Sequence, residues 1–317
     1  MRFFSKPKKT GRLLALGFHS DGLSAASVRR PDGDPKGKPE VKLASFVPVP
    51  DARSGDAIEK LNKEVHAGQY ACAALLAGGE YQLLSVEAPA VPAEELKTAI
   101  KWRLKDMLDF PVDQATLDVL NIPMDKAPVG RANSIFAVVA RNSVIETRQN
   151  LFADAKLSLT VIDIPEMAQR NVSALLEIEN RGLAMLSFSE EGGLLTVTYN
   201  GELYLSRRID VTVDNLLGDD YDRKHGFFDR ITLELQRSLD HFERQYSFIN
   251  VAKLVLAPTG ASGLDEYLSS NLYTKVETLD LASVLDLSAV PDLASAAVQQ
   301  KFFLTLGAAL RAEQAAA

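Results

Sequence analysis

The sequence of 317 residues contains one cysteine, Cys72, and one tryptophan, Trp102. A single cysteine cannot form an intramolecular disulfide, and the apolar run around Cys72 is typical of a small core residue in a reducing compartment. No apolar run approaches the roughly 20 residues that a membrane-spanning helix requires. The N-terminus also lacks the apolar stretch of a secretory signal. These absences predict a cytoplasmic protein.

Positive charge is scarce as well, because 35 lysines and arginines stand against 42 acidic residues, for a formal net charge of −7. Nucleic-acid binding depends on basic residues that neutralise phosphates, so this balance argues against a nucleic-acid partner. The exception is the N-terminus, where Phe3 and Phe4 precede three lysines. We predict that residues 1–10 form a disordered basic tail, and the alternative is weak contact of this tail with an anionic membrane surface.

The sequence also lacks the common catalytic motifs. It has no P-loop, no dinucleotide-binding fingerprint and no nucleophile elbow. The four histidines are scattered, and none has the spacing of a metal-binding pair. The residues therefore predict neither a metal site nor a catalytic residue.

What the sequence does contain is one order of elements repeated. Three strands are followed by helix, strand, helix, strand and helix, and the last helix is predicted at 293–313. The first copy opens with strands at 13–17, 24–30 and 41–47, and the second opens with strands at 182–188, 194–200 and 202–209. A duplicated frame of this kind is characteristic of two ribonuclease-H-like halves that face each other across a cleft, which is the actin-like architecture.

A small module interrupts the first copy. The pattern predicts a strand at 81–87, a helix that begins at Pro92, and strands at 116–122 and 134–140. We therefore assign residues 80–141 to an inserted strand-helix-strand-strand subdomain. The first half then comprises residues 11–79 and 142–180, and the second half comprises residues 181–317.

Trp102 is the unusual residue of this module. The apolar stripe of its helix is formed by Leu96, Ile100, Leu104 and Met107, and Trp102 lies outside that stripe. One interpretation is that Trp102 packs on the adjoining half of the protein. The alternative is that it anchors a partner peptide, as exposed aromatic residues do in protein interfaces.

A nucleotide site in an actin-like cleft requires glycine or another small residue, with a carboxylate, where phosphate and Mg²⁺ approach the backbone. The residues that best match these positions are Gly17, Asp21, Gly201 and Gly260, and the match is weak. In the first hairpin, His19 stands where the acid belongs and Asp21 where a glycine belongs.

The other two nucleotide motifs are also degraded. Ser187 and Ser189 occupy the acid and glycine positions of the second hairpin, and Pro258-Thr259 replaces the late glycine pair. The sequence therefore disfavours ATP and Mg²⁺ as cofactors. The rival hypothesis is an active actin-like ATPase or small-molecule kinase that uses the cleft, and only Asp21 or Asp163 could then hold Mg²⁺.

Several segments resemble the PilM family, the actin-like proteins of type IV pilus assembly. They are EELKTAIKWRLKDMLDFPVDQATLD at 94–118, LELQRSLDHF at 233–242 and LGAALR at 306–311, in the order expected for that family. The opening, FFSKPKKTGRLLALGFHSDGLSAASV at 3–28, is similar to the MshI branch, which serves mannose-sensitive haemagglutinin-type pili.

The resemblance implies a fold like that of the cell-division protein FtsA. It also implies a scaffold on the cytoplasmic side of the inner membrane, which binds the N-terminal tail of a single-span membrane protein (PilN or MshJ) and links it to the assembly ATPase. PilM-type members bind ATP, but the departures at His19 and Pro258-Thr259 mean that this site is not carried over. The implied partner groove lies between the module and the first half, and we expect Trp102, Phe110, Leu117 and Val119 to line it.

Overall fold

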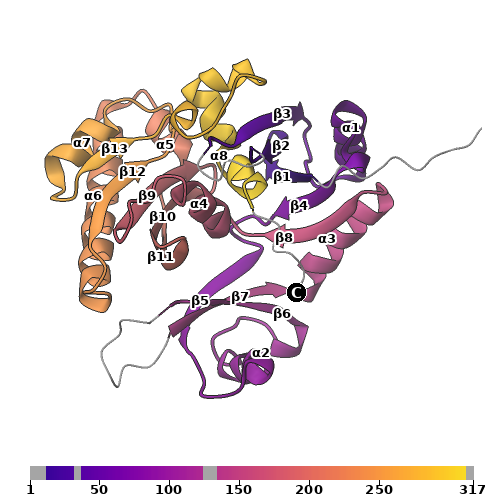
Figure 1. Ribbon diagram of the computed structural model, residues 1–317, viewed down its shortest axis with the longest axis horizontal. Coiled ribbons are helices and arrows are strands. Elements are labelled where there is room, and N and C mark those ends of the chain that lie inside the picture. Colours follow the sequence, from indigo (N-terminus) through magenta and orange to yellow (C-terminus); the bar gives the residue numbers. More distant parts are fainter. Residues whose placement is uncertain (1–11, 32–36, 124–133, 312–317) are drawn as a thin grey trace, which may run out of the picture. The chain divides into compact units, whose positions relative to one another are not determined.

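Figure 1 shows the protein as a computed structural model that describes residues 12–31, 37–123 and 134–311. The predicted basic tail at 1–10 lies outside the described residues, and so does the end of the helix predicted at 293–313. The chain divides into two compact units, residues 76–150 and residues 1–75 with 151–317. The smaller unit extends beyond the predicted insertion on both sides, because Arg148 forms an ion pair at 2.8 Å with Glu80.

The smaller unit contains an antiparallel sheet in the order β5 (Tyr81–Glu87), β7 (Ser134–Arg141) and β6 (Ala115–Asn121). Helix α2 (Ala93–Arg103) covers one face of this sheet, and Ile100 and Leu104 are buried against β7 (Figure 1). A short 3₁₀ helix, η2 (Val112–Gln114), precedes β6. Met107 does not continue the apolar stripe of α2, because the helix ends at Arg103 and Met107 lies in the following turn.

The larger unit contains two five-stranded sheets of identical topology. The first has the order β3 (Glu40–Pro48), β2 (Gly22–Arg29), β1 (Leu13–His19), β4 (Ala71–Leu75) and β8 (Ser158–Asp163). The second has the order β11 (Glu202–Ile209), β10 (Gly192–Tyr199), β9 (Gly182–Ser189), β12 (Val251–Leu256) and β13 (Val276–Thr278). In both sheets the first three strands are antiparallel and the last two are added in parallel. The predicted duplication is thus present strand for strand.

The remaining helices are α1 (Gly55–Val65), α3 (Asn142–Asp154), α4 (Pro165–Ser173), α5 (Val213–Leu217), α6 (Tyr221–Gln245), α7 (Leu264–Asn271) and α8 (Ala296–Ala309), with 3₁₀ helices η1 (Ala67–Gln69), η3 (Leu281–Ser283) and η4 (Pro291–Ala294). They follow the predicted order with two differences. The short α5 was not predicted. The sequence pattern predicts the start of helix α6 near Gly226, but the helix begins at Tyr221, because the Asp220 side chain accepts a hydrogen bond from the Arg223 amide and caps it. In the described part of the chain, no helix is long and apolar enough to cross a membrane.

Helices α4 and α8 exchange sheets. Helix α4 ends the first half in sequence but packs on β9, β10 and β11 of the second, whereas α8 ends the second half and packs on β1, β2 and β4 of the first. Figure 1 shows both helices between the two sheets. Gln169 of α4 is fully buried, and its amide donates to the Met185 carbonyl at 2.9 Å and to the Leu194 carbonyl at 3.1 Å. One continuous apolar core therefore joins the two halves.

The two helices touch at Gly307. A Cβ built on Gly307 would lie 2.2 Å from the Ala168 carbonyl oxygen, far inside van der Waals contact. The Gly307 carbonyl accepts a hydrogen bond of 2.9 Å from the Asn171 side chain. The backbones of α4 and α8 are thus in direct contact, and this is the physical reason for a glycine in the interior of an otherwise apolar helix.

Gly307→Ala should destabilise the protein, although alanine is the better helix former. The added methyl group must push α4 away from α8, and overpacking of this kind costs about 1–3 kcal/mol or more. The control is Gly226→Ala in α6, where no atom lies within 4 Å of the new Cβ. That substitution should be neutral or stabilising by up to about 1 kcal/mol. Urea denaturation of both variants checks this, and equal midpoints would contradict the close contact.

Candidate functional site

A carboxylate joins the tips of the β1–β2 and β9–β10 hairpins, where an actin-like nucleotide site would bind phosphate. The turn between β1 and β2 contains Ser20 and Asp21, and the turn between β9 and β10 contains Glu190. The Glu190 carboxylate accepts hydrogen bonds from the Ser20 amide, at 2.9 and 3.1 Å, and from the Ser20 hydroxyl. A negatively charged group of the protein thus already occupies the backbone donor at the tip of the first hairpin.

Asp21 is held by α8. Its carboxylate forms an ion pair with the Lys301 ammonium at 2.5 Å, and this ammonium lies 3.7 Å from the centre of the Phe46 ring. Desolvation raises the pKa of Asp21, but the hydrogen bond and the charge of Lys301 outweigh it, so the pKa falls below its usual value. A Mg²⁺ ion would have to displace Lys301 before it could bind this carboxylate.

Side chains fill the space beside Gly17. A Cβ at Gly17 would lie 2.5 Å from the Thr305 hydroxyl and 2.6 Å from the Ser24 hydroxyl. The Ser24 hydroxyl is hydrogen-bonded to Thr305 at 2.6 Å and to the His19 imidazole at 2.8 Å. Gly17 therefore makes room for α8, and this contact leaves no space for a phosphate on the same side of the hairpin.

His19, which replaces the expected acid, is largely buried in this cluster. Desolvation lowers the pKa of His19 below 6.5, the nearby Glu190 carboxylate raises it, Lys301 lowers it, and the net shift is downward. The imidazole is therefore neutral near pH 7 and acts as a hydrogen-bonding partner of Ser24. Ser24 itself is fully buried, so this histidine and serine have a structural role.

Asp163, the other candidate for Mg²⁺, is also paired. One oxygen of this buried carboxylate lies 2.8 Å from the Arg311 guanidinium, just after α8, and the other accepts from the Ile164 amide at 3.0 Å. The N-cap of α4 is Ile164, without a side-chain hydrogen bond. Asp163 thus fastens the end of α8 to the first sheet and does not cap the next helix.

In the second hairpin, the serine at the acid position likewise makes a structural contact. The Ser187 hydroxyl donates to the Gln169 side chain at 2.5 Å and so helps to anchor α4. Gly201 is another residue predicted for the nucleotide site. It lies in the turn between β10 and β11, where its φ of 73° suits glycine, and its amide donates to Glu177 at 2.7 Å. Gly201 thus lies in a hairpin turn that is hydrogen-bonded to Glu177, in the segment after α4.

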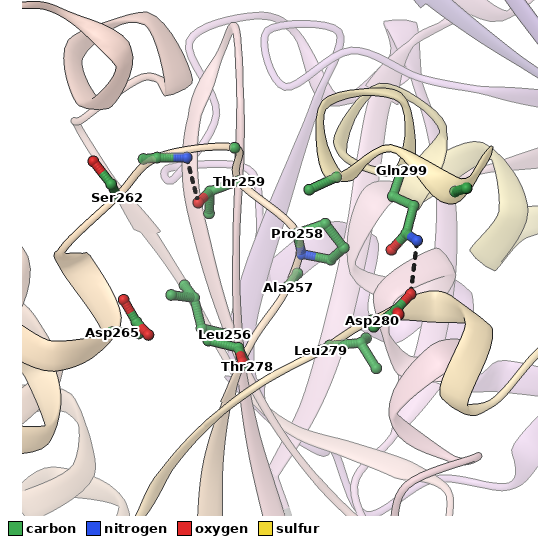
Figure 2. A pocket seen from close by; sticks show the side chains of 14 residues that line it. Leu256, Ala257, Pro258, Thr259, Ser262, Asp265, Thr278, Leu279, Asp280 and Gln299 are labelled. Atoms are coloured by element: carbon green, nitrogen blue, oxygen red, sulfur yellow. Dashed lines mark hydrogen bonds between the residues drawn. The ribbon is translucent and has the colours of Figure 1, made fainter. Parts of the chain in front are cut away.

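A cavity of about 500 Å³ lies at the carboxyl end of β12, where the late glycine pair was expected (Figure 2). Pro258, Thr259 and Gly260 form one wall, and Asp280 and Gln299 form the opposite one. The Gln299 amide donates to Asp280 at 2.7 Å, and this hydrogen bond is the main cause of the lowered pKa of Asp280. Gly260 borders the start of α8, with Ala297 beside it.

The four residues expected in the partner groove do not have the same environment. Phe110 is buried below the Arg141 guanidinium, which lies 4.1 Å from its ring centre. Leu117 and Val119 are half-buried on β6 and pack against the core of the smaller unit. Trp102 is 69% exposed. Of these four residues, Trp102 is thus the most exposed, Leu117 and Val119 are accessible in part, and Phe110 is buried.

Three residues that complete the cleft were not predicted. They are Glu190, in the second hairpin, and Lys301 and Thr305, within the predicted last helix. The spacing of Lys301 and Thr305 could have indicated them, because polar residues four apart lie on one face of a largely apolar helix. The structure brings Gly17, Asp21 and Gly260 to α8, whereas Gly201 lies at the end of α4.

Glu190→Ala should expose the Ser20 amide to solvent. Without the carboxylate, this amide has no hydrogen-bond acceptor within the described residues, so its hydrogen exchange should accelerate by about five-fold or more, as for loss of one charge-assisted bond. Glu191→Ala, in the same turn, is the control and should leave the exchange of Ser20 unchanged. Unaltered protection of the Ser20 peptide in Glu190→Ala would show that the two tips are not joined in solution.

His19 should make the stability of the protein sensitive to pH. Because its pKa in the folded state lies below 6.5, the unfolded chain binds the proton more tightly, and stability is lost as the pH falls below about 6.5. His19→Gln keeps a hydrogen-bonding side chain without the titration, so its loss of stability between about pH 7.5 and about pH 5 should be smaller. His241→Gln, at an exposed position, is the control. Parallel curves for wild type and His19→Gln would contradict this assignment.

Comparisons with known proteins bear on the fold. No family model and no curated protein matches the sequence. Among solved structures, the chain is similar to one titled "PilM-PilN type IV pilus biogenesis complex", with 18% identity, a TM-score of 0.75, and coverage of 94% of this chain and 97% of that one. A Bacteroides thetaiotaomicron protein with an actin-like ATPase fold and unknown function matches with 11% identity, a TM-score of 0.50, and coverage of 93% and 99%.

These two matches cover nearly the whole chain and agree with its two sheets of identical topology. The predicted fold class is confirmed. The chain has the actin-like fold, with an inserted strand-helix-strand-strand subdomain.

Proposed function

We propose that this protein is a non-catalytic scaffold of a type IV pilus or related secretion machine. It would lie on the cytoplasmic face of the inner membrane and bind the N-terminal tail of a single-span membrane protein, of the PilN or MshJ kind. The observation that carries the proposal is the match over 94% of the chain to a protein solved in the PilM–PilN complex. Within this class, the segment at 3–28 favours the MshI branch.

The occupied hairpins support a scaffold over an ATPase. Glu190 covers the Ser20 amide, Lys301 neutralises Asp21, and Arg311 neutralises Asp163. An ATPase of this architecture needs these positions for phosphate and Mg²⁺. Each carboxylate or donor is instead used to fasten one half to the other, which is the arrangement that a static platform needs.

The smaller unit is the place where we expect the tail to bind. Strand β6 is an edge strand, paired only with β7 among the described strands, and an extended peptide can add to such an edge by main-chain hydrogen bonds. Leu117 and Val119 alternate along β6 and are half-buried, so they would form the apolar floor for alternate side chains of the peptide. Phe110 supports that floor from the core.

Calorimetry with a synthetic peptide tests the proposal. The peptide corresponds to the cytoplasmic N-terminal tail of the single-span membrane protein encoded beside this chain, and a scrambled peptide is its control. We expect one-to-one binding of the native peptide at micromolar concentration and none of the scrambled one, since a short peptide that buries a small interface binds in about that range.

A parallel titration with ATP and Mg²⁺ addresses the rival function. We expect no binding to the wild-type protein, because the donors of the first hairpin are already engaged. Micromolar ATP binding that is abolished by Asp21→Asn would favour the ATPase. Absence of heat with the native peptide would overturn the scaffold.

A further inference from the structure

An exposed group of residues at the end of α2 combines apolar and basic side chains. We call it the Trp102 patch, and it comprises Lys101, Trp102, Arg103, Lys105 and Met107. The indole of Trp102 is 69% exposed and Met107 is 50% exposed, which places them among the most exposed large apolar side chains of the described chain. The helix core does not use either residue, because Ile100 and Leu104 fill the space above the sheet.

The patch is locally positive on an acidic protein. Its three cations lie near two carboxylates, Asp106 and Asp113, while the whole chain carries a formal net charge of −7. Arg103 donates to the Glu87 carbonyl at 3.0 Å, a neutral acceptor, so its charge is not cancelled. Lys105 forms no ion pair with any described residue. Lys101 approaches Asp113 only at 3.9 Å, and the Asp113 side chain is almost fully exposed.

Two other carboxylates of this unit, Asp118 and Asp109, form ion pairs with basic side chains. Lys97 forms an ion pair with Asp118 at 2.8 Å, and Asp109 forms one with Arg141 at 3.1 Å. Glu94 and Glu95 lie in the first turn of α2, at the opposite end of the helix. The surface that surrounds Trp102 and Met107 therefore presents lysine and arginine.

This combination has a specific chemical preference. Tryptophan is favoured at the boundary between lipid headgroups and acyl chains, where its ring is buried and its N–H stays hydrated. Lysine and arginine beside it extend their stems along apolar surface and bind anionic headgroups. Because the protein as a whole is acidic, an anionic bilayer repels most of its surface and attracts a face of this kind.

We propose that the Trp102 patch is a contact site for an anionic lipid surface. It lets the smaller unit rest on the membrane beside the single-span partner, and it deepens the proposed function, on which it rests for the location of the protein. A partner peptide is the alternative occupant. The observations favour lipid because Arg103 and Lys105, beside the exposed indole, form no ion pair with a described residue.

The test uses the full-length protein and its only tryptophan as the reporter. Vesicles of phosphatidylethanolamine with phosphatidylglycerol are compared with vesicles of phosphatidylcholine. With the anionic vesicles we expect a blue shift of the Trp102 emission and protection from iodide quenching, both reversed by high salt. With phosphatidylcholine we expect neither change.

Sedimentation with the same vesicles separates the patch from the rest of the chain. Trp102→Ala and Lys105→Glu should each weaken partitioning onto anionic vesicles by about five-fold or more, since each basic or interfacial residue contributes a factor of about that size. The matched controls are Tyr273→Ala, at a fully exposed aromatic residue, and Lys63→Glu, at an exposed lysine of α1. Both controls should bind like the wild type.

The outcomes are distinguishable. If Trp102→Ala and Lys105→Glu partition like the wild type, another basic segment such as the N-terminal residues binds the lipid, and the proposal is overturned. It is overturned as well if the emission shifts only with the partner peptide. The proposed function is tested separately, because Lys105→Glu should retain the calorimetric binding of that peptide. Vesicle binding without peptide binding would preserve the lipid contact and remove the scaffold.

Discussion

The contact between the backbones of α4 and α8 is the constraint on which the larger unit depends. Each helix ends one half and packs on the sheet of the other, so separation of the halves would expose the apolar core that they share. The contact is possible only because residue 307 has no side chain, since a Cβ there would overlap the Ala168 carbonyl. The close contact between Gly307 and Ala168 therefore sets how deeply α8 packs between the sheets.

The position of α8 in turn explains why the hairpins contain protein groups. Lys301 and Thr305 precede Gly307 on the same helix, and the seating of that helix brings them to Asp21 and to the space beside Gly17. His19 then completes the cluster as a neutral partner of Ser24. The departures at Asp21 and Ser187 are therefore connected, because these residues contact α8 and α4 in place of a phosphate or Mg²⁺.

The strands and most helices could be predicted from the sequence because they depend on local periodicity and capping. Alternation of apolar residues identified β5 and β11 to the residue, whereas α5 is too short for its pattern to register. The contacts of the site could not be predicted in this way. Ser20 and Glu190 are 170 residues apart, and Asp163 and Arg311 are 148 apart, so no local pattern links them. The turn that contains Gly201 could not be recognised either, because a glycine in a hairpin turn resembles a glycine beside a phosphate when only the sequence is considered.

The side-chain contacts between the two hairpins change how a ligand could couple the two halves. In an actin-like frame, a ligand between the hairpins can couple the two halves only if it makes contacts that the empty protein lacks. Here the Glu190 carboxylate supplies those contacts from within the chain, and the buried Gln169 fixes α4 on the second sheet. The halves therefore need no bound phosphate to be joined. Among the described residues, the edge strand β6 and the exposed end of α2 offer surfaces to a partner, and both belong to the inserted unit.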